Sequence, residues 1–268
     1  MRRSGKGRIL DPRSFVVYYG YGPLAGIEGF DLALLAPTGW SAGDLAALKG
    51  FGVTAIAYLS VLEATDAAYR QAGLGPDDLL RVEGRPWRRQ EFGTWVVHPR
   101  SERWRSHLAR SAGALMAAGW DGLFLDTVGD VEDAALQGEV GWLLPAVAEL
   151  VHHVRLAAPS AWIVQNNGVW LLLPLVVNDI DGVCWETSVE MAASGPFAEA
   201  ALRSLTLAKN RYRIAPLLLG SVDSGPDEGP ATRVLHDLAR RFGFRCYIAP
   251  GTYTAAVRLP DGRILPGH

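Results

Sequence analysis

Eight short apolar segments are spaced along the 268 residues of this chain, and their order restricts its fold more than any other feature. Each is rich in β-branched or aromatic residues and is bounded by Gly, Pro or Asp, as buried strands are. Most are continuously apolar, which is typical of parallel strands covered on both faces. We predict strands at Phe15–Gly20, Asp31–Ala36, Val53–Ser60, Gly122–Thr127, Trp162–Asn167, Gly182–Thr187, Ala215–Val222 and Arg245–Pro250.

Amphipathic segments separate most of these strands. The segment after Ser41 places Leu45 and Leu48 on one face and ends at a glycine pair, as a short helix does. Similar patterns predict further helices from about Ser101, over about 139–157 before Pro159, and over about 196–210 and 230–242.

Strands that alternate with helices over this length are the pattern of a (β/α)₈, or TIM, barrel. We therefore predict an α/β fold with one barrel domain over residues 14–268, preceded by a flexible or disordered segment, residues 1–13. An open doubly wound sheet is the alternative. It is disfavoured because the first candidate turn, Gly20-Tyr21-Gly22-Pro23, lacks the third glycine of a dinucleotide-binding turn.

Composition argues against several classes of function. A formal charge of -2 and a pI near 6.3 provide no basic surface for nucleic acid. The chain has no apolar run long enough to span a membrane and no signal-peptide core, so we expect a cytoplasmic protein, or a secreted one if the printed chain is trimmed. Cys184 and Cys246 lie in apolar segments and indicate core thiols. The oligomeric state stays open.

Chemistry in TIM barrels lies at the carboxyl ends of the strands. Asp126 ends the fourth strand and Glu186 ends the sixth, and a carboxylate beside a buried strand is costly unless it is solvated, paired or used. We predict these two as catalytic residues. The other candidate site residues are at or beside strand ends, except Trp95, which belongs to the irregular segment 62–99 that follows the third strand and should lie over the active face. They are Tyr18, Tyr19, Tyr58, Ser60, Glu63, Trp95, Asp130, Asn166, Asn167, Trp185, Asp223 and Tyr253.

The residue types at these ends favour a sugar site. They are acids, amides and aromatic residues without Lys, Arg or His, so a Schiff base, a zinc site and a phosphate site are disfavoured, and we expect no metal and no cofactor. Asp126 and Glu186 lie on alternate strands, within reach of the separation of about 5–5.5 Å that retaining glycosidases use. Among the tryptophans, Trp95, Trp170 and Trp185 are the candidates for stacking on a sugar ring.

These motifs, taken in order, resemble glycoside hydrolase family 114, the endo-α-1,4-polygalactosaminidase family. The matching stretches cover most of the chain. They are Tyr18-Tyr19-Gly20, the run from Ala57 to Ala64 with Tyr69-Arg70, Trp95-Val96-Val97, the run from Gly119 to Thr127, the run from Gln165 to Gly168, and the run from Asp181 to Glu186.

The resemblance implies a (β/α)₈ barrel in which Asp126 is the nucleophile and Glu186 the general acid/base. It implies hydrolysis, with retention, of an oligo- or polysaccharide of α-1,4-linked galactosamine. A cationic amino-sugar polymer would be attracted by an acid-rich mouth that includes Glu63, Asp130 and Asp223. Leu62 replaces a glycine of the family motif and Asp130 lies farther along the chain than the family's second Asp, which keeps open a barrel that binds oligosaccharide without cutting it. A transglycosylase that uses the same two acids is the third alternative.

Overall fold

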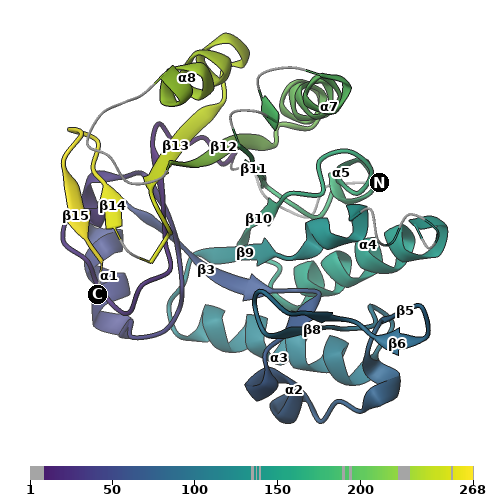
Figure 1. The fold of residues 1–268 in the computed structure, drawn as a ribbon. Helices are drawn as coiled ribbons and strands as arrows, with labels where there is room; N and C mark the ends of the chain where they lie inside the picture. Colours follow the sequence, from purple (N-terminus) through teal and green to yellow (C-terminus); the bar gives the residue numbers. More distant parts are fainter. Residues whose placement is uncertain are drawn as a thin grey trace.

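The computed structural model describes residues 9–133, 136, 138, 140–188, 191–192, 195–222, 230–254 and 256–267. Eight parallel strands form a nearly closed barrel in the order in which they occur along the chain (Figure 1). They are β1 (Phe15–Tyr18), β2 (Leu32–Leu35), β3 (Thr54–Ser60), β9 (Gly122–Asp126), β10 (Trp162–Asn166), β11 (Gly182–Glu186), β12 (Ala215–Val222) and β13 (Arg245–Pro250). All eight predicted strands are confirmed, and the sequential order excludes a doubly wound sheet.

Helices surround the barrel, as Figure 1 shows. They are α1 (Ala42–Gly50), α3 (Glu102–Ala117), α4 (Val140–Ala157), α5 (Leu173–Val176), α7 (Pro196–Tyr212) and α8 (Pro230–Phe242), with short 3₁₀ turns η1 (Ile27–Gly29), η2 (Pro76–Asp78) and η3 (Val128–Glu132). The sequence determines where α1 begins, because the side chains of Ser41 and Asp44 each accept the other residue's backbone N–H group. The five predicted helices are confirmed. Within the described residues, no helix has the length and apolar character needed to cross a membrane.

The alternation of side chains along each strand decides which residues reach the barrel interior. In β9, Leu123 belongs to the apolar layer between strands and helices. Phe124 belongs to a second cluster, which draws side chains from all eight strands. Asp126 follows Phe124 by two residues and therefore faces inward. Asn166 follows Val164 of β10 by two residues, and Glu186 follows Cys184 of β11 by two residues, so both side chains also face inward.

Three aspartates, Asp31, Asp121 and Asp181, precede strands at the amino end of the barrel. Each carboxylate accepts a backbone N–H at or beside the start of the preceding strand of the barrel, at 2.9–3.1 Å. Asp121 and Asp181 also donate their own N–H groups to carbonyls of those same neighbouring strands. The Asp-Gly pairs that open β9 and β11 therefore align neighbouring strands at the end opposite the site.

Part of the predicted flexible N-terminal segment is ordered. Leu10 is only 6% exposed and lies against Gly182, the first residue of β11. Arg13 pairs with Asp31 at 3.0 Å, and the side chain of Arg245 donates to a carbonyl in this segment. These contacts place residues 9–13 against the amino end of the barrel, whereas residues 1–8 lie outside the described part of the chain.

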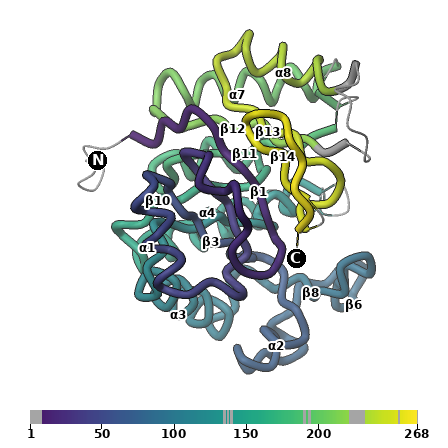
Figure 2. Tube along the Cα trace, turned by 90° about the vertical axis from the view of Figure 1, so that its left-hand side faces the viewer, coloured from purple at the N-terminus to yellow at the C-terminus, as the bar shows by residue number. Residues whose placement is uncertain are grey.

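Residues 62–99, which we call the insertion, separate β3 from α3. They contain α2 (Asp66–Ala72), the ribbon of β5 (Arg81–Val82) and β6 (Arg85–Pro86), and a small antiparallel sheet of β4 (Glu63–Ala64), β8 (Thr94–Val96) and β7 (Arg88–Arg89). Seen from the side, β6 and β8 project away from the N-terminus (Figure 2). The indole N–H of Trp104 anchors the start of the insertion by donating to the Val61 carbonyl at 2.7 Å.

The seam of the barrel lies between β13 and β1. In the described residues the strand ladder ends at β13 and does not continue to β1. The Phe15 and Tyr247 rings pack across the seam with their centroids 5.9 Å apart. Above them, the Tyr19 N–H donates to the Tyr253 carbonyl at 2.8 Å. Tyr253, which follows β13, is thereby held at the mouth of the barrel.

We predict that Asp181→Ala lowers the free energy of unfolding more than Asp121→Ala does. Both lose a hydrogen bond to a strand, but the partner of Asp181 is the buried Arg155, bound at 2.6 Å, whereas the partner of Asp121 is the exposed Lys49. Breaking a buried pair costs about 3 kcal/mol or more, and an exposed pair contributes about 1 kcal/mol or less. Urea unfolding of the two variants measures the difference, and equal losses would contradict this assignment.

Candidate active site

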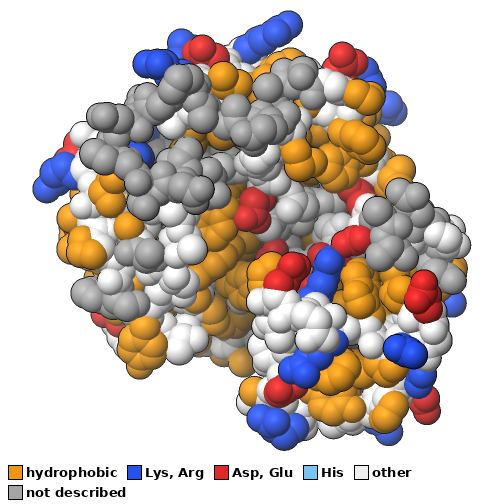
Figure 3. Space-filling model, in the orientation of Figure 1, with side chains coloured by type: hydrophobic (Ala, Val, Ile, Leu, Met, Phe, Trp, Pro, Cys, Tyr) orange, Lys and Arg blue, Asp and Glu red, His pale blue; other side chains and the backbone are white. Residues whose placement is uncertain are grey.

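A cavity of about 770 Å³ opens at the carboxyl ends of the strands. Figure 3 shows it as a hollow with acidic side chains inside. The predicted site residues that line it are Tyr19, Tyr58, Ser60, Glu63, Asp126, Asp130, Asn166, Asn167, Trp185, Glu186 and Tyr253. The insertion also lines this cavity, as expected from its place after the third strand.

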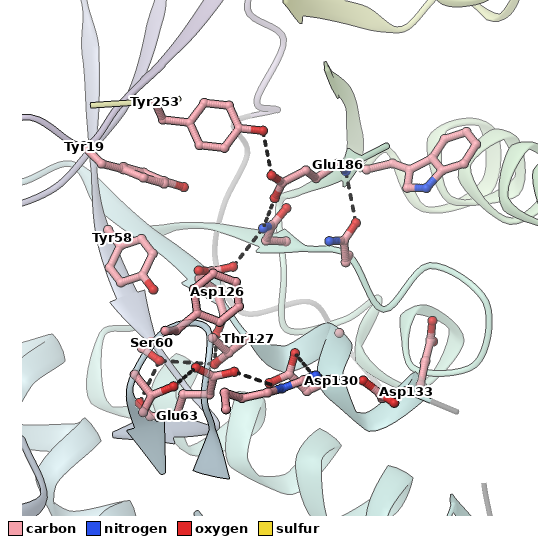
Figure 4. A pocket seen from close by; sticks show the side chains of 18 of the residues that line it. Tyr19, Tyr58, Ser60, Glu63, Asp126, Thr127, Asp130, Asp133, Glu186 and Tyr253 are labelled. Atoms are coloured by element: carbon pink, nitrogen blue, oxygen red, sulfur yellow. Dashed lines mark hydrogen bonds and ion pairs between the residues drawn. The ribbon is translucent and has the colours of Figure 1, made fainter. Parts of the chain in front are cut away.

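Asn166 joins the two predicted catalytic carboxylates. Its side-chain nitrogen donates to Asp126 Oδ1 at 2.8 Å and to Glu186 Oε2 at 3.0 Å (Figure 4). Because both oxygens contact the same nitrogen, they are at most about 6 Å apart. Asn166 lies on β10, between the strands that carry the two acids, so the strand order itself produces this bridge.

Glu186 is held by two further contacts. Its Oε1 accepts the hydroxyl of Tyr253 at 2.6 Å, and its backbone N–H donates to Asn167 Oδ1 at 3.0 Å. Asn167 adopts a left-handed backbone with φ of 55°. A Cβ at Gly129 would lie 2.6 Å from the Asn167 Cβ, so only glycine permits this close approach of η3 to the turn after β10.

Tyr19, Tyr58 and Tyr253 form an aromatic wall of the cavity. The Tyr19 ring meets the other two edge-on, with centroids 5.2 and 5.5 Å away. Burial, followed by the charges of Asp126 and Glu186, raises the pKa of Tyr19 and Tyr253 well above the ordinary value. Burial and the Asp126 charge and hydrogen bond likewise raise the pKa of Tyr58. All three hydroxyls therefore stay protonated and can donate hydrogen bonds at neutral pH.

Thr127 positions the end of β9 against the end of β3. Its hydroxyl oxygen lies 3.1 and 2.8 Å from the backbone nitrogens of Val61 and Leu62, whose N–H groups it accepts. The residue has φ of 64°, a rare and strained conformation for a β-branched side chain. The strain immediately after Asp126 is therefore offset by hydrogen bonds to the start of the insertion.

Arg89, from the insertion, lies among three acids of the cavity. Its guanidinium nitrogens are 3.5 Å from Glu63, 3.3 Å from Asp130 and 2.9 Å from Asp133. The hydroxyl of Thr94 also donates to Glu63. The sequence analysis found no cationic side chain at the ends of the barrel strands, but the insertion folds back over the mouth and supplies one.

The neighbours of Asp130 shift the pKa of its carboxyl group. Burial raises its pKa to about 8, together with a hydrogen bond to Glu63 and the charge of that residue, whereas Arg89 opposes the rise. At neutral pH Asp130 is therefore mostly protonated. The three acids and Arg89 then carry far less negative charge than three free carboxylates would.

Three predicted residues do not offer a surface to the cavity. Tyr18 is fully buried and does not line the cavity, because Tyr19, one residue later, takes the direction of the mouth. Trp95 lies outside the cavity lining; its indole N–H donates to Asp66, and Arg88 covers its ring. Trp185 borders the cavity but is 1% exposed, because its position in β11 turns it outward. Asp223 lies outside the described residues.

Among the lining residues that sequence reasoning missed are Arg89, Thr127, Glu132 and Asp133. Thr127 directly follows a strand end, so its position was a usable signal. Arg89 and Asp133 gave no signal, since neither is at the end of a barrel strand and they meet only in the folded chain. Leu62, which replaces a glycine of the family motif, is a core residue outside the cavity lining. Where the structure describes the chain, no group of three or more His, Cys, Asp or Glu could hold a metal ion.

Comparisons with known proteins agree with this geometry. The chain matches the model of glycoside-hydrolase family GH114 over residues 29–204. In solved structures it is similar to the glycoside hydrolase domain of PelA from Pseudomonas aeruginosa, at 24% identity and a TM-score of 0.71, covering 89% of this chain and 94% of that one. No curated protein matches the chain in sequence.

Two further solved structures share the fold. Ega3 of Aspergillus fumigatus, in complex with galactosamine, is 13% identical with a TM-score of 0.70, covering 88% of this chain and 90% of that one. The α-galactosidase TtGalA of Thermus thermophilus, in complex with stachyose, is 16% identical with a TM-score of 0.58. The match covers 95% of this chain and 64% of that one. Because the family match spans well over half of its length, this chain belongs to glycoside-hydrolase family GH114 and is a glycoside hydrolase.

Proposed function

We propose that this enzyme hydrolyses an α-1,4-linked galactosamine polysaccharide with retention, using Asp126 as nucleophile and Glu186 as general acid/base. The observation that carries the proposal is the Asn166 amide, which holds oxygens of the two carboxylates at most about 6 Å apart. Retaining glycosidases space their carboxyl groups by about 5–5.5 Å, whereas inverting enzymes need about 6.5–9.5 Å to admit a water.

The reaction then proceeds in two displacements. Asp126 attacks the anomeric carbon while Glu186 gives its proton to the glycosidic oxygen, which leaves with the cleaved chain. Glu186 next takes a proton from water, the hydroxyl attacks the same carbon, and Asp126 departs as a carboxylate. The net change is the addition of one water across the glycosidic bond.

The hydroxyl of Tyr253 can hydrogen-bond to Glu186 in both protonation states of that carboxyl group. With Glu186 ionised, the phenol donates to Oε1, as observed at 2.6 Å. With Glu186 protonated, the same phenol oxygen can accept, because a hydroxyl is both donor and acceptor. The contact can therefore persist through both displacements.

The charge of the cavity supports a cationic sugar at the catalytic pair. Among the described residues, no ion pair joins Asp126 or Glu186 to a cationic side chain, so an ammonium group of the substrate would be attracted there. Glu63, Asp130 and Asp133 are instead paired with Arg89. We therefore assign the attraction to the catalytic pair rather than to the whole mouth. The galactosamine bound in the Ega3 structure supports an amino sugar.

We expect Asp126→Asn and Glu186→Gln each to abolish cleavage of partly deacetylated α-1,4-galactosaminan, because each removes one of the two reacting carboxylates. Asp121→Asn is the matched control, since Asp121 precedes the same strand at the opposite end. Reducing-end release measures turnover in all three. Normal turnover by either catalytic variant would overturn the assignment.

Retention has its own test. Proton NMR during early hydrolysis should show the α-anomer of the new reducing end before mutarotation. A β-anomer as first product would rule out the double displacement, while leaving hydrolysis of the polymer intact.

Tyr253→Phe should lower kcat on the order of tenfold or more with little change in KM, because it removes a hydrogen bond to Glu186 but keeps the ring contact with Tyr19. Tyr247→Phe is the control, since that buried phenol accepts a backbone N–H away from the cavity. Steady-state kinetics compare the two. A loss of equal size in both would show a structural effect.

Asp130→Asn should flatten the pH dependence of stability. Since the pKa of Asp130 is raised to about 8, the native protein holds a proton that the unfolded chain has lost, and the free energy of unfolding falls as pH rises from about 4 to 8. One such proton changes stability by up to about 1.4 kcal/mol per pH unit. Urea unfolding at pH 5 and pH 8 checks this, and equal slopes for both proteins would refute it.

A further inference from the structure

Large apolar side chains are exposed on one rim of the cavity. Met191 lines the cavity and is 51% exposed, and Phe197, at the start of α7, is 72% exposed. Trp170 lines the cavity beside them, with its ring edge-on to that of Phe197 at 6.4 Å and 82°. In Figure 3, hydrophobic side chains border the hollow on the side of α7. Exposed apolar surface at one edge of a binding cavity indicates a contact for a ligand.

Trp170 is held in place before any ligand binds. Its indole N–H donates to the Phe197 carbonyl at 3.0 Å. The carboxylate of Glu132 accepts the backbone N–H groups of Trp170, Leu171 and Leu172 at 2.6–3.3 Å. The turn after β10 is therefore fixed to η3, and the polar edge of the indole is already satisfied. What Trp170 offers to the cavity is apolar ring surface.

The order of strands around the barrel places this rim. Trp170 follows β10, whereas Met191 and Phe197 follow β11, the strand that ends in Glu186. The tyrosine wall, formed with Tyr19 of the β1 end and Tyr253 after β13, occupies the other arc of the mouth. The apolar rim therefore lies on the arc of the mouth that follows β10 and β11, beside the proposed catalytic pair, where a neighbouring unit of a polymer would lie.

We propose that Trp170, Met191 and Phe197 form a stacking platform for a sugar unit other than the one attacked by Asp126. This inference rests on the proposed function and names a second contact of the same polymer. The axial O4 of a galacto-configured ring gathers its C3, C4 and C5 hydrogens on one face, which is apolar enough to cover an aromatic ring. The platform consequently adds affinity only to oligomers long enough to reach it.

Binding measured against oligomer length tests the platform. In a Glu186→Gln background, calorimetry compares the α-1,4-galactosamine dimer with the hexamer. We expect Phe197→Ala and Trp170→Ala each to raise the Kd of the hexamer on the order of tenfold and to leave that of the dimer unchanged. Trp170→Phe, which retains an aromatic face, should keep most of the hexamer affinity.

Two controls separate the platform from damage to the fold. Phe51→Ala removes an equally exposed phenylalanine, 70% exposed at the end of α1 and away from the cavity, and should change neither affinity. Phe197→Ala removes a side chain that is already mostly in solvent, so it should leave the unfolding temperature unchanged even if Trp170→Ala lowers it.

The outcomes distinguish this inference from the proposed function. Normal hexamer affinity in Phe197→Ala and Trp170→Ala, or an equal loss for dimer and hexamer, would overturn the platform even if the wild-type enzyme cleaves galactosaminan. If the wild type does not cleave galactosaminan, hexamers of N-acetylgalactosamine and of α-1,4-glucose are tested in the same variants. A loss confined to one such hexamer would support the platform while the proposed substrate fails, and no binding of any hexamer would overturn both.

Discussion

The site depends on holding two carboxylates close together against their mutual repulsion. The structure does this with one amide, because Asn166 donates to both Asp126 and Glu186. The amide lies on the strand between them, so the hydrogen-bonded sheet fixes all three backbones at once. Tyrosine hydroxyls that stay protonated surround the pair, and they supply donors without adding charge. The barrel thus provides the rigidity that two acids at this separation require.

The second acid group of the cavity is stabilised in a different way. Glu63, Asp130 and Asp133 come together around Arg89, and burial keeps Asp130 protonated at neutral pH. The cavity therefore has a part around Asp126 and Glu186, bridged by an amide, and a second part in which Arg89 largely neutralises the acids, although both parts are rich in acids. Acid content alone is a poor measure of the charge that a substrate meets.

The sequence predicted the barrel well because its strands are continuous apolar runs that alternate with amphipathic helices. It also indicated Asp126, Asn166 and Glu186, since all three end parallel strands and share the inward direction of alternate residues. Tyr18 and Trp185 were misplaced by one position of that same alternation, which a strand boundary alone does not settle. Arg89 could not be predicted, because the path of the insertion depends on tertiary contacts rather than on a periodic pattern.

The close approach of Gly129 to Asn167 couples the positions of Asp126 and Glu186. The turn that follows the strand of Asp126 presses on the turn that follows the strand of Asn166, and Asn167 in that second turn receives the Glu186 backbone N–H. A displacement beside one of the two proposed catalytic acids is therefore transmitted to the other through two backbone turns. The distance between the two acids therefore depends on the packing of these two turns, and a side chain introduced at Gly129 would disturb it.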